Sequence, residues 1–187
     1  DSIGNAIDGA VLGSPVLGPS AFGPVIGGMT FDGVDDYIQI PDSPSVDFGT
    51  KPFSVMLWMK TNVVPTTSWH GLWTKHNGAW GHDNDYGLQI MQSTCAPEAY
   101  LSNSSGSFER ATGAFSVCDN AWHLLASVRT PDQRLQLWVD GRLAASVPAT
   151  IDPSNGNPVN IGRNSYGGGH GYFAGDLDEV VLFNRAL

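Results

Sequence analysis

Aromatic and imidazole side chains are concentrated in one polar segment of this chain, residues 63–85, which reads VVPTTSWHGLWTKHNGAWGHDND. The segment holds half of the six tryptophans and three of the five histidines, namely Trp69, Trp73, Trp80, His70, His76 and His82. Sugar rings present apolar C–H faces and polar edges, and an indole with neighbouring amide and imidazole groups suits both. The segment therefore predicts a carbohydrate-binding surface.

A second loop, residues 164–172 (NSYGGGHGY), adds aromatic and imidazole groups, and its glycine run lets a backbone approach a ligand closely. The predicted sugar-binding residues of both regions are Trp69, Trp73, His76, Asn77, Trp80, His82, Tyr86, Tyr166 and His170. Two alternatives remain open: Trp69 and Trp73 cap a hydrophobic core, or the glycine run is only a flexible connection. Zinc is disfavoured, because a histidine every six residues matches no known ligand spacing.

The acidic run HDND offers oxygen ligands for a cation at the rim of the first loop. Asp83 and Asp85 would be its carboxylate ligands, since calcium prefers oxygen ligands. This is the weaker of two calcium sites that we expect; the other is described below. Adjacent residues cannot all face one ion without an irregular backbone. A solvated turn, which Asp and Asn favour, is therefore the alternative.

Catalysis requires acidic pairs or nucleophile motifs that this sequence lacks. A retaining glycosidase needs two carboxyl groups about 5 Å apart. The three glutamates, Glu98, Glu109 and Glu179, do not form the Glu-x-Asp-x-x-Glu pattern, and no G-x-S-x-G element is present. The sequence therefore predicts binding rather than catalysis, with a divergent polysaccharide lyase or glycoside hydrolase as an alternative.

The elements that would position these loops are short β-strands. In residues 53–60, Phe53, Val55, Leu57 and Met59 alternate with residues of the other face, a period of two that is typical of a strand. Strands are also expected at residues 37–40, 72–75, 86–91, 99–102, 114–117, 122–129, 135–139, 142–147, 159–162 and 177–183, with an irregular segment and at most one edge strand in residues 1–29.

Two of these expectations define the architecture further. Asp140-Gly141 predicts a tight hairpin turn, because glycine supplies the positive φ that such turns need. The last strand is apolar on both faces, which predicts a place inside a packed sandwich.

Composition agrees with one all-β domain over residues 1–187. The chain has 187 residues with 23 Gly, 12 Pro and only 14% charged residues, which favours many short strands around one core. The net charge of −9 disfavours nucleic acid and anionic membranes as partners. No run of about 18 apolar residues is present, so no membrane insertion is expected.

The two cysteines, Cys95 and Cys118, flank a polar segment. In an oxidising compartment their disulfide would contribute about 3 kcal/mol. Such bridges suit secreted β domains, so a disulfide and an extracellular or cell-surface location are expected. Two buried thiols in a cytosolic protein are the alternative.

Four segments resemble, in order, the landmarks of laminin-G-like domains of the concanavalin A-like lectin/glucanase superfamily. They are DSIGNAIDG at residues 1–9, FDGVDDYIQIPDS at 31–43, WHLLASVRTPDQRLQLWVDGRLAAS at 122–146 and GDLDEVVLFNRAL at 175–187. The resemblance implies a jelly-roll β-sandwich of two antiparallel sheets. It leaves the identity of the ligand open.

The resemblance also implies a structural calcium that ties the N-terminal segment to the final strand. The implied ligands are Asp178, Asp32, Asn5, Asp1 and Gly33. The alternative is that Asp32 and its neighbours only shape a tight turn. We expect a secreted domain of a larger protein. Its expected partners are a polysaccharide or glycan and the other domains of that parent protein. A protein-binding adhesion domain is the second interpretation.

Overall fold

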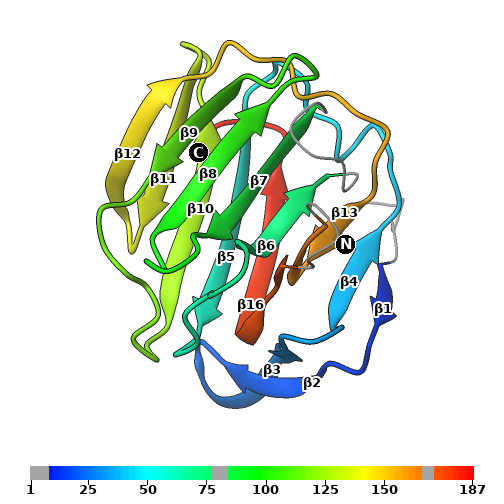
Figure 1. Cartoon of the computed structure of the whole chain (residues 1–187), viewed down its shortest axis with the longest axis vertical. Coiled ribbons are helices and arrows are strands. Elements are labelled where there is room, and N and C mark those ends of the chain that lie inside the picture. The colour runs from blue at the N-terminus through cyan, green and yellow to red at the C-terminus, as the bar shows by residue number, and fades with distance from the viewer. Residues whose placement is uncertain (1–8, 77–83, 166–170) are drawn as a thin grey trace.

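The computed structural model describes residues 9–76, 84–165 and 171–187, and these ranges contain strands and turns but no helix. Most strands belong to two antiparallel sheets of seven strands each (Figure 1). Sheet A contains, in spatial order, β1 (Ala10–Leu12), β4 (Tyr37–Ile40), β13 (Val159–Ile161), β6 (His70–Lys75), β7 (Asp85–Ile90), β8 (Pro97–Ser102) and β9 (Phe108–Thr112). Sheet B contains β12 (Arg142–Pro148), β11 (Arg134–Val139), β10 (His123–Arg129), β5 (Phe53–Lys60), β16 (Ala174–Phe183), β3 (Gly23–Asp32) and β2 (Val16–Ser20). A small hairpin pairs β14 (Arg163–Asn164) with β15 (Gly171–Tyr172).

One hydrophobic core lies between the sheets, and β5 shows how the sequence builds it. Every second residue from Phe53 to Met59 has at most 1% of its surface exposed, whereas Met56, Trp58 and Lys60 on the other face are half-buried. From sheet A, alternate residues of β7 enter the same core. The predicted two-sheet β-sandwich is therefore confirmed. None of the described residues belongs to a helix of the length and apolar character needed to cross a membrane.

The final strand, β16, lies inside sheet B between β5 and β3, as its apolar sequence predicted. β3 pairs only with residues 174–177 of this strand. Beyond them a bulge between Asp178 and Val181 shifts the register with β5, and Glu179 adopts a φ of 48° there. Residues 180–183 are consequently half-buried rather than covered on both faces.

The hairpin and disulfide predictions are confirmed. Asp140 and Gly141 have φ values of 50° and 74°, and two successive positive values are what a type I′ turn requires between β11 and β12. Cys95 and Cys118 form a disulfide with a Cα–Cα distance of 5.8 Å.

Two strand predictions are wrong. Residues 114–117 form no strand, because Val117 is held instead by a backbone hydrogen bond to Cys95 beside the disulfide. The strand that precedes this segment is β9, which was not predicted. Its sequence shows no apolar alternation, because Ala111 is its only buried residue. Residues 1–29 contain β1, β2 and most of β3 rather than one edge strand, since glycine and proline there weaken the apolar signal.

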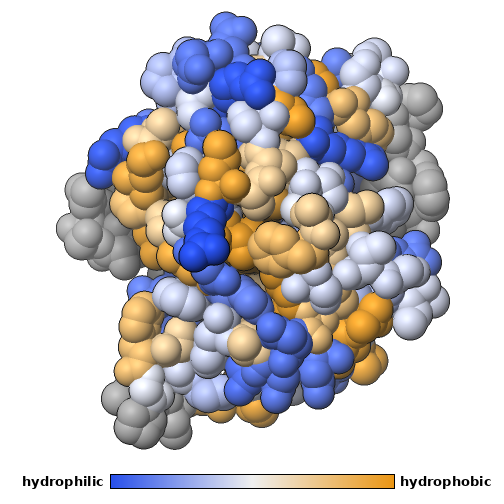
Figure 2. All heavy atoms as spheres, turned by 90° about the vertical axis from the view of Figure 1, so that its left-hand side faces the viewer, coloured by the Kyte–Doolittle hydropathy of each residue, from blue (hydrophilic) through white to orange (hydrophobic). Residues whose placement is uncertain are grey.

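Apolar and polar residues lie side by side on the flank of the sandwich formed by the edge strands β9 and β12 (Figure 2). Phe115 and Leu143 are each 49% exposed near this flank. Scattered apolar side chains of this kind are ordinary on a soluble surface.

Candidate functional site

The outer face of sheet A carries polar residues because its strands alternate. In β7, Tyr86, Leu88 and Ile90 are fully buried in the core, so Asp85 and Gln89 project from the opposite face. The register places Asp85 opposite Ser102 and Gln89 opposite Glu98, which brings the polar residues of β8 to the same face. Residues of β9 continue this face, since Tyr100 is paired with Arg110 and Ser102 with Phe108.

The β14–β15 hairpin lies against this outer face, next to β6. A side chain at Gly71 would place its Cβ 2.4 Å from the carbonyl of Arg163, so only glycine admits the hairpin backbone. A Cβ at Gly171 would lie even closer, 1.8 Å from the carbonyl oxygen of Trp69. The hairpin brings Asn164 over β7, where its amide donates a hydrogen bond of 2.7 Å to Gln89.

A pocket opens between the hairpin and the last strands of sheet A. Its walls combine aromatic, amide, imidazole and charged groups: Trp69, His76, Asp85, Gln89, Tyr100, Phe108, Arg110 and Asn164. The guanidinium of Arg110 stacks 4.2 Å above the ring of Phe108. Apolar rings beside convergent polar groups are the usual composition of small-molecule sites.

Hydrogen bonds hold the polar floor of the pocket in place. The Gln89 side chain accepts from Asn164 and donates to Glu98 at 2.9 Å, and Thr112 donates to the other oxygen of Glu98 at 2.7 Å. The Asp85 carboxylate lies 3.3 Å from Nε2 of His76 and accepts from Ser102. Buried polar groups that are linked in this way are rigid, so the floor is preorganised.

The structure divides the predicted sugar-binding residues into three groups. Trp69 and His76 line the pocket. Trp73 and Tyr86 are corrections, because both lie in the core, where they are 1% and 0% exposed. Trp73 follows the bulge in β6, and its burial agrees with the alternative that it caps the core. Burial raises the pKa of the Tyr86 phenol, whose hydroxyl donates to the Val46 carbonyl. The remaining predicted residues lie outside the described ranges: Asn77, Trp80, His82, Tyr166 and His170.

Most residues of the pocket floor and of its far wall were not predicted from the sequence. Tyr100, Phe108, Arg110 and Asn164 were not predicted as binding residues, although all of them line the pocket. The available signal was polar residues at every second position of 98–102 within an apolar strand context. Asp85, predicted as a weak calcium ligand, is instead 3% exposed beside His76, and Asp83 lies outside the described ranges.

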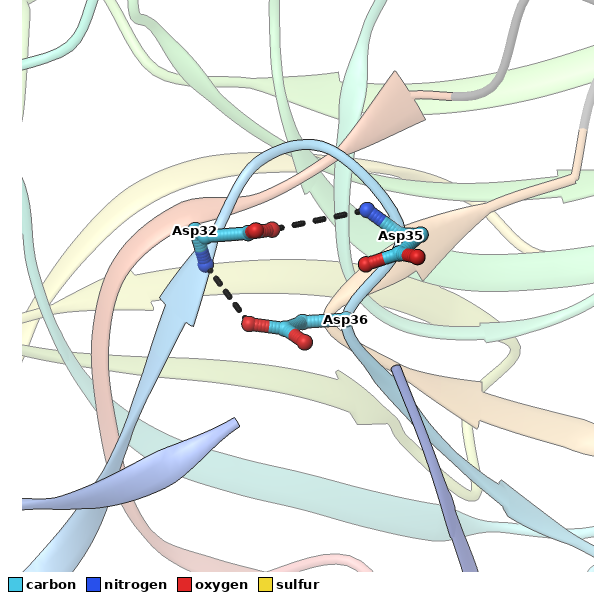
Figure 3. A group of neighbouring side chains, drawn as sticks. All are labelled: Asp32, Asp35 and Asp36. Atoms are coloured by element: carbon cyan, nitrogen blue, oxygen red, sulfur yellow. Dashed lines mark hydrogen bonds between the residues drawn. The ribbon is translucent and has the colours of Figure 1, made fainter. Parts of the chain in front are cut away.

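Three carboxylates meet in the turn after β3 (Figure 3). One oxygen of each of Asp32, Asp35 and Asp36 lies within 4.8 Å of the others. Asp32 accepts backbone hydrogen bonds from Val34 and Asp35, and Asp36 accepts from Ser14 and Asp32. The predicted turn-shaping role of Asp32 is therefore present. Three carboxylates this close together are also oxygen donors of the kind that calcium prefers.

Asp178, the other predicted calcium ligand, lies elsewhere. Its carboxylate accepts hydrogen bonds from Ser20 and from the backbone of Ala21, at 3.0 Å each, and so ties β16 to the end of β2. Asp32 is paired with Ala174, four residues before Asp178, which separates them by about 13 Å along the strand. The structure therefore does not bring Asp32 and Asp178 to one ion, while Gly33 stays beside Asp32. Asp1 and Asn5 lie outside the described ranges.

Comparisons with known proteins agree with this architecture. A sequence model of the concanavalin A-like lectin/glucanases superfamily, Laminin_G_3, matches residues 32–187. Comparison with curated protein sequences found no match. Domain 4 of AbnA, a GH43 extracellular arabinanase from Geobacillus stearothermophilus in complex with arabinotriose, has a TM-score of 0.71 at 16% identity, over 94% of this chain and 77% of that chain.

Two toxin binding domains share the fold. The binding domain of Paraclostridial Mosquitocidal Protein 1 has a TM-score of 0.67 at 12% identity, over 95% of this chain and 43% of that chain. The binding domain of botulinum neurotoxin DC in complex with SialylT has a TM-score of 0.69 at 10% identity, over 96% and 43%. This chain thus spans less than half the length of either toxin domain, and at these identities the likeness shows the fold alone. The sequence match, which covers most of the chain, shows that it belongs to the concanavalin A-like lectin/glucanase superfamily as a laminin-G-like domain.

Proposed function

We propose that this protein is a non-catalytic carbohydrate-binding domain whose ligand enters the pocket on the outer face of sheet A. The observation that carries the proposal is the pocket itself, where Trp69 and Phe108 offer apolar ring faces beside the fixed polar groups of Gln89 and Asn164. Such a wall stacks on the C–H face of a sugar, while polar groups of the lining, among them the exposed Arg110, bond to its hydroxyl groups. The glycan-bound structures among its structural neighbours support this choice of ligand class.

The spacing of carboxylates favours binding over glycoside hydrolysis. Asp85 and Glu98 lie on adjacent strands, but Asp85 is opposite Ser102, four residues from Glu98. The resulting separation of about 13 Å exceeds the 5–9.5 Å that the two glycosidase geometries need. Glu98 is also engaged by Gln89 and Thr112 rather than directed at a ligand.

We further propose a structural calcium at the turn after β3, held by Asp32, Asp35 and Asp36 with the main-chain carbonyl of Gly33. The mutual repulsion of the three carboxylates supports the proposal, because a bound cation would relieve it. This placement changes the predicted ligand set, since Asp178 is replaced by the two other carboxylates of the turn.

We also place the domain outside the cell, within a larger protein whose other domains are its neighbours. The disulfide supports this location, because such bridges persist in oxidising compartments. The extracellular arabinanase among the structural neighbours agrees with it.

A glycan array with the wild-type protein tests the function, followed by calorimetry on any glycan that binds. We expect Trp69→Ala to weaken binding by at least about ten-fold, since aromatic anchors carry a large share of binding energy. Trp138→Ala is the control, because Trp138 lies half-buried on sheet B, away from the pocket. Equal affinity in wild type and Trp69→Ala would contradict the proposed site.

A protein-binding adhesion domain is the second candidate, and one observation favours it. The outer face of sheet B carries an apolar depression lined by Met56, Leu124, Ala126, Val128, Trp138, Gly141 and Leu187. Nearby, the 66% exposed ring of Phe22 contacts Trp58 edge to face. Apolar surface of this kind suits a protein partner. A wild-type protein that binds no glycan on the array would favour this function.

A further inference from the structure

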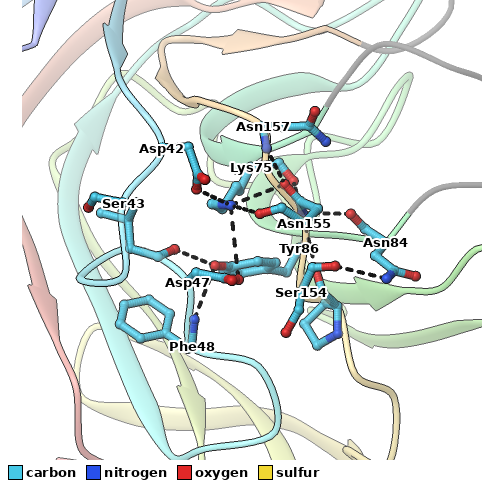
Figure 4. A network of polar contacts seen from close by, with 12 residues as sticks. Asp42, Ser43, Asp47, Phe48, Lys75, Asn84, Tyr86, Ser154, Asn155 and Asn157 are labelled. Carbon is cyan, nitrogen blue, oxygen red and sulfur yellow. Dashed lines mark hydrogen bonds and ion pairs between the residues drawn. The ribbon is translucent and has the colours of Figure 1, made fainter.

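Lys75, the last residue of β6, is fully buried although it carries a charge. Its ammonium lies 2.8 Å from the Asp42 carboxylate and 4.0 Å from Asp47 (Figure 4). It also donates to the main-chain carbonyl and to the side-chain oxygen of Asn155. A buried charge persists when it is paired and hydrogen-bonded, so this lysine fixes the loop of Asn155 against the end of sheet A.

Asn155 is the centre of this network (Figure 4). The two N–H groups of its side-chain amide are shared among three carbonyls, with N···O distances of 2.6 Å to Asn84, 3.1 Å to Pro153 and 3.4 Å to Lys75. Its side-chain oxygen accepts from Lys75 and from the backbone of Asn157. One amide group therefore contacts both the last residue of β6 and the residue that precedes β7.

Two of the three carbonyls that Asn155 contacts lie next to the pocket. The Lys75 carbonyl belongs to the peptide bond with His76, and the Asn84 carbonyl belongs to the peptide bond with Asp85. His76 and Asp85 form the 3.3 Å contact at the pocket wall, and each is 3% exposed. A shift of either peptide unit would change the position of one partner of this contact.

We propose that Asn155, fixed by Lys75, is a positioning residue that sets the His76–Asp85 contact and thereby the affinity of the pocket for its glycan. The role in affinity rests on the proposed function, whereas the geometric role does not. Asn155 does not line the pocket, so it acts through the two peptide units.

Asn155→Asp is a near-isosteric test, because it replaces the donating nitrogen by an oxygen that faces three carbonyls. Asn157→Asp is the matched control, since it adds the same charge in the same loop and no hydrogen bond of the Asn157 side chain is found within the described residues. If Asn155→Asp does not fold, Asn155→Ala against Asn157→Ala gives the same comparison. The readouts are the imidazole NMR signals of His76, assigned with His76→Gln, and the dissociation constant of a glycan selected by the array.

We expect the Asn155 variant to shift the His76 imidazole signals and to weaken glycan binding by about ten-fold, as loss of one member of a buried hydrogen-bond network usually does. The Asn157 variant should leave both unchanged. A role in stability alone would lower the melting temperature without moving the His76 signals, and unchanged signals overturn the proposal. If the wild-type protein binds no glycan, the proposed function fails, while shifted His76 signals still support the positioning role.

Discussion

Gln89 shows how single residues build the site. It is 6% exposed, yet its amide is satisfied on both sides, by Asn164 and by Glu98. A buried amide with one partner missing would cost about 1–3 kcal/mol, so this arrangement is stable only because β8 and the β14–β15 hairpin both supply partners. The aspartate cluster after β3 is different, because its charges are close together and two of the three are exposed.

The calcium proposal predicts a stability that depends on the ion. Calcium at about 100 times its dissociation constant stabilises a protein by about 2.7 kcal/mol, so chelation should lower the melting temperature by about 5–10 °C. Asp35→Asn should abolish this dependence, because it removes one of the three charges that would hold the ion. The variant is a clean test, since no hydrogen bond of the Asp35 carboxylate is found within the described residues. Scanning calorimetry with and without chelator measures it, with exposed Asp132→Asn as control. An unchanged melting temperature of the wild type in the presence of chelator would contradict the calcium site.

At the scale of elements, side-chain contacts hold the start of β10 beside the β11–β12 turn. His123 starts β10, and its Nδ1 lies 2.8 Å from Asp140 in the β11–β12 turn while its Nε2 lies 3.1 Å from Asp119. Both ring nitrogens can donate only in the imidazolium form. Burial alone would lower the pKa of His123, but hydrogen bonds to Asp140 and Asp119 and their charges outweigh burial and raise this pKa.

This contact predicts a pH dependence of stability. Because the folded pKa of His123 lies above its ordinary value, the contribution is complete below about pH 6.5 and is lost as the pH rises through the folded pKa. The wild type should therefore exceed His123→Gln in stability by more at pH 5 than at pH 9. Urea unfolding of both proteins at the two pH values measures the difference. A constant difference across this range would show that the imidazolium contact does not contribute.

At the scale of the whole molecule, the disulfide joins parts of both sheets. Cys95 lies between β7 and β8 of sheet A, whereas Cys118 precedes β10 of sheet B, 23 residues further along the chain. Gln92 and Ser93, next to this bridge, bond to the carbonyls of Thr66 and Pro65. The bridge therefore also supports the segment that leads to Trp69.

Removal of the bridge should destabilise the whole domain. A disulfide of this loop length contributes about 2–4 kcal/mol, chiefly by restricting the unfolded chain. The double variant Cys95→Ser, Cys118→Ser should therefore unfold at a lower urea concentration with a similar slope. The wild type measured with reductant provides the comparison. Equal midpoints for the oxidised wild type and the double variant would contradict this contribution.

Local patterns in the amino-acid sequence suffice to predict the sandwich, the Asp140-Gly141 hairpin and two residues that line the pocket. Alternation within one strand and the φ preference of glycine are local properties, so both are readable from neighbouring residues. Trp69 and His76 were found because they are an aromatic and an imidazole residue in a polar segment.

Which of the aromatic residues line the pocket depends on long-range packing. Trp73 follows Trp69 by four positions, but the strand directs it into the core, and the bulge in β6 that sets this register is not visible in composition. Arg110 and Asn164 reach the pocket from strands that are distant in sequence. Strand register and the crossing of the hairpin over Gly71 depend on contacts between distant segments, which no local pattern encodes.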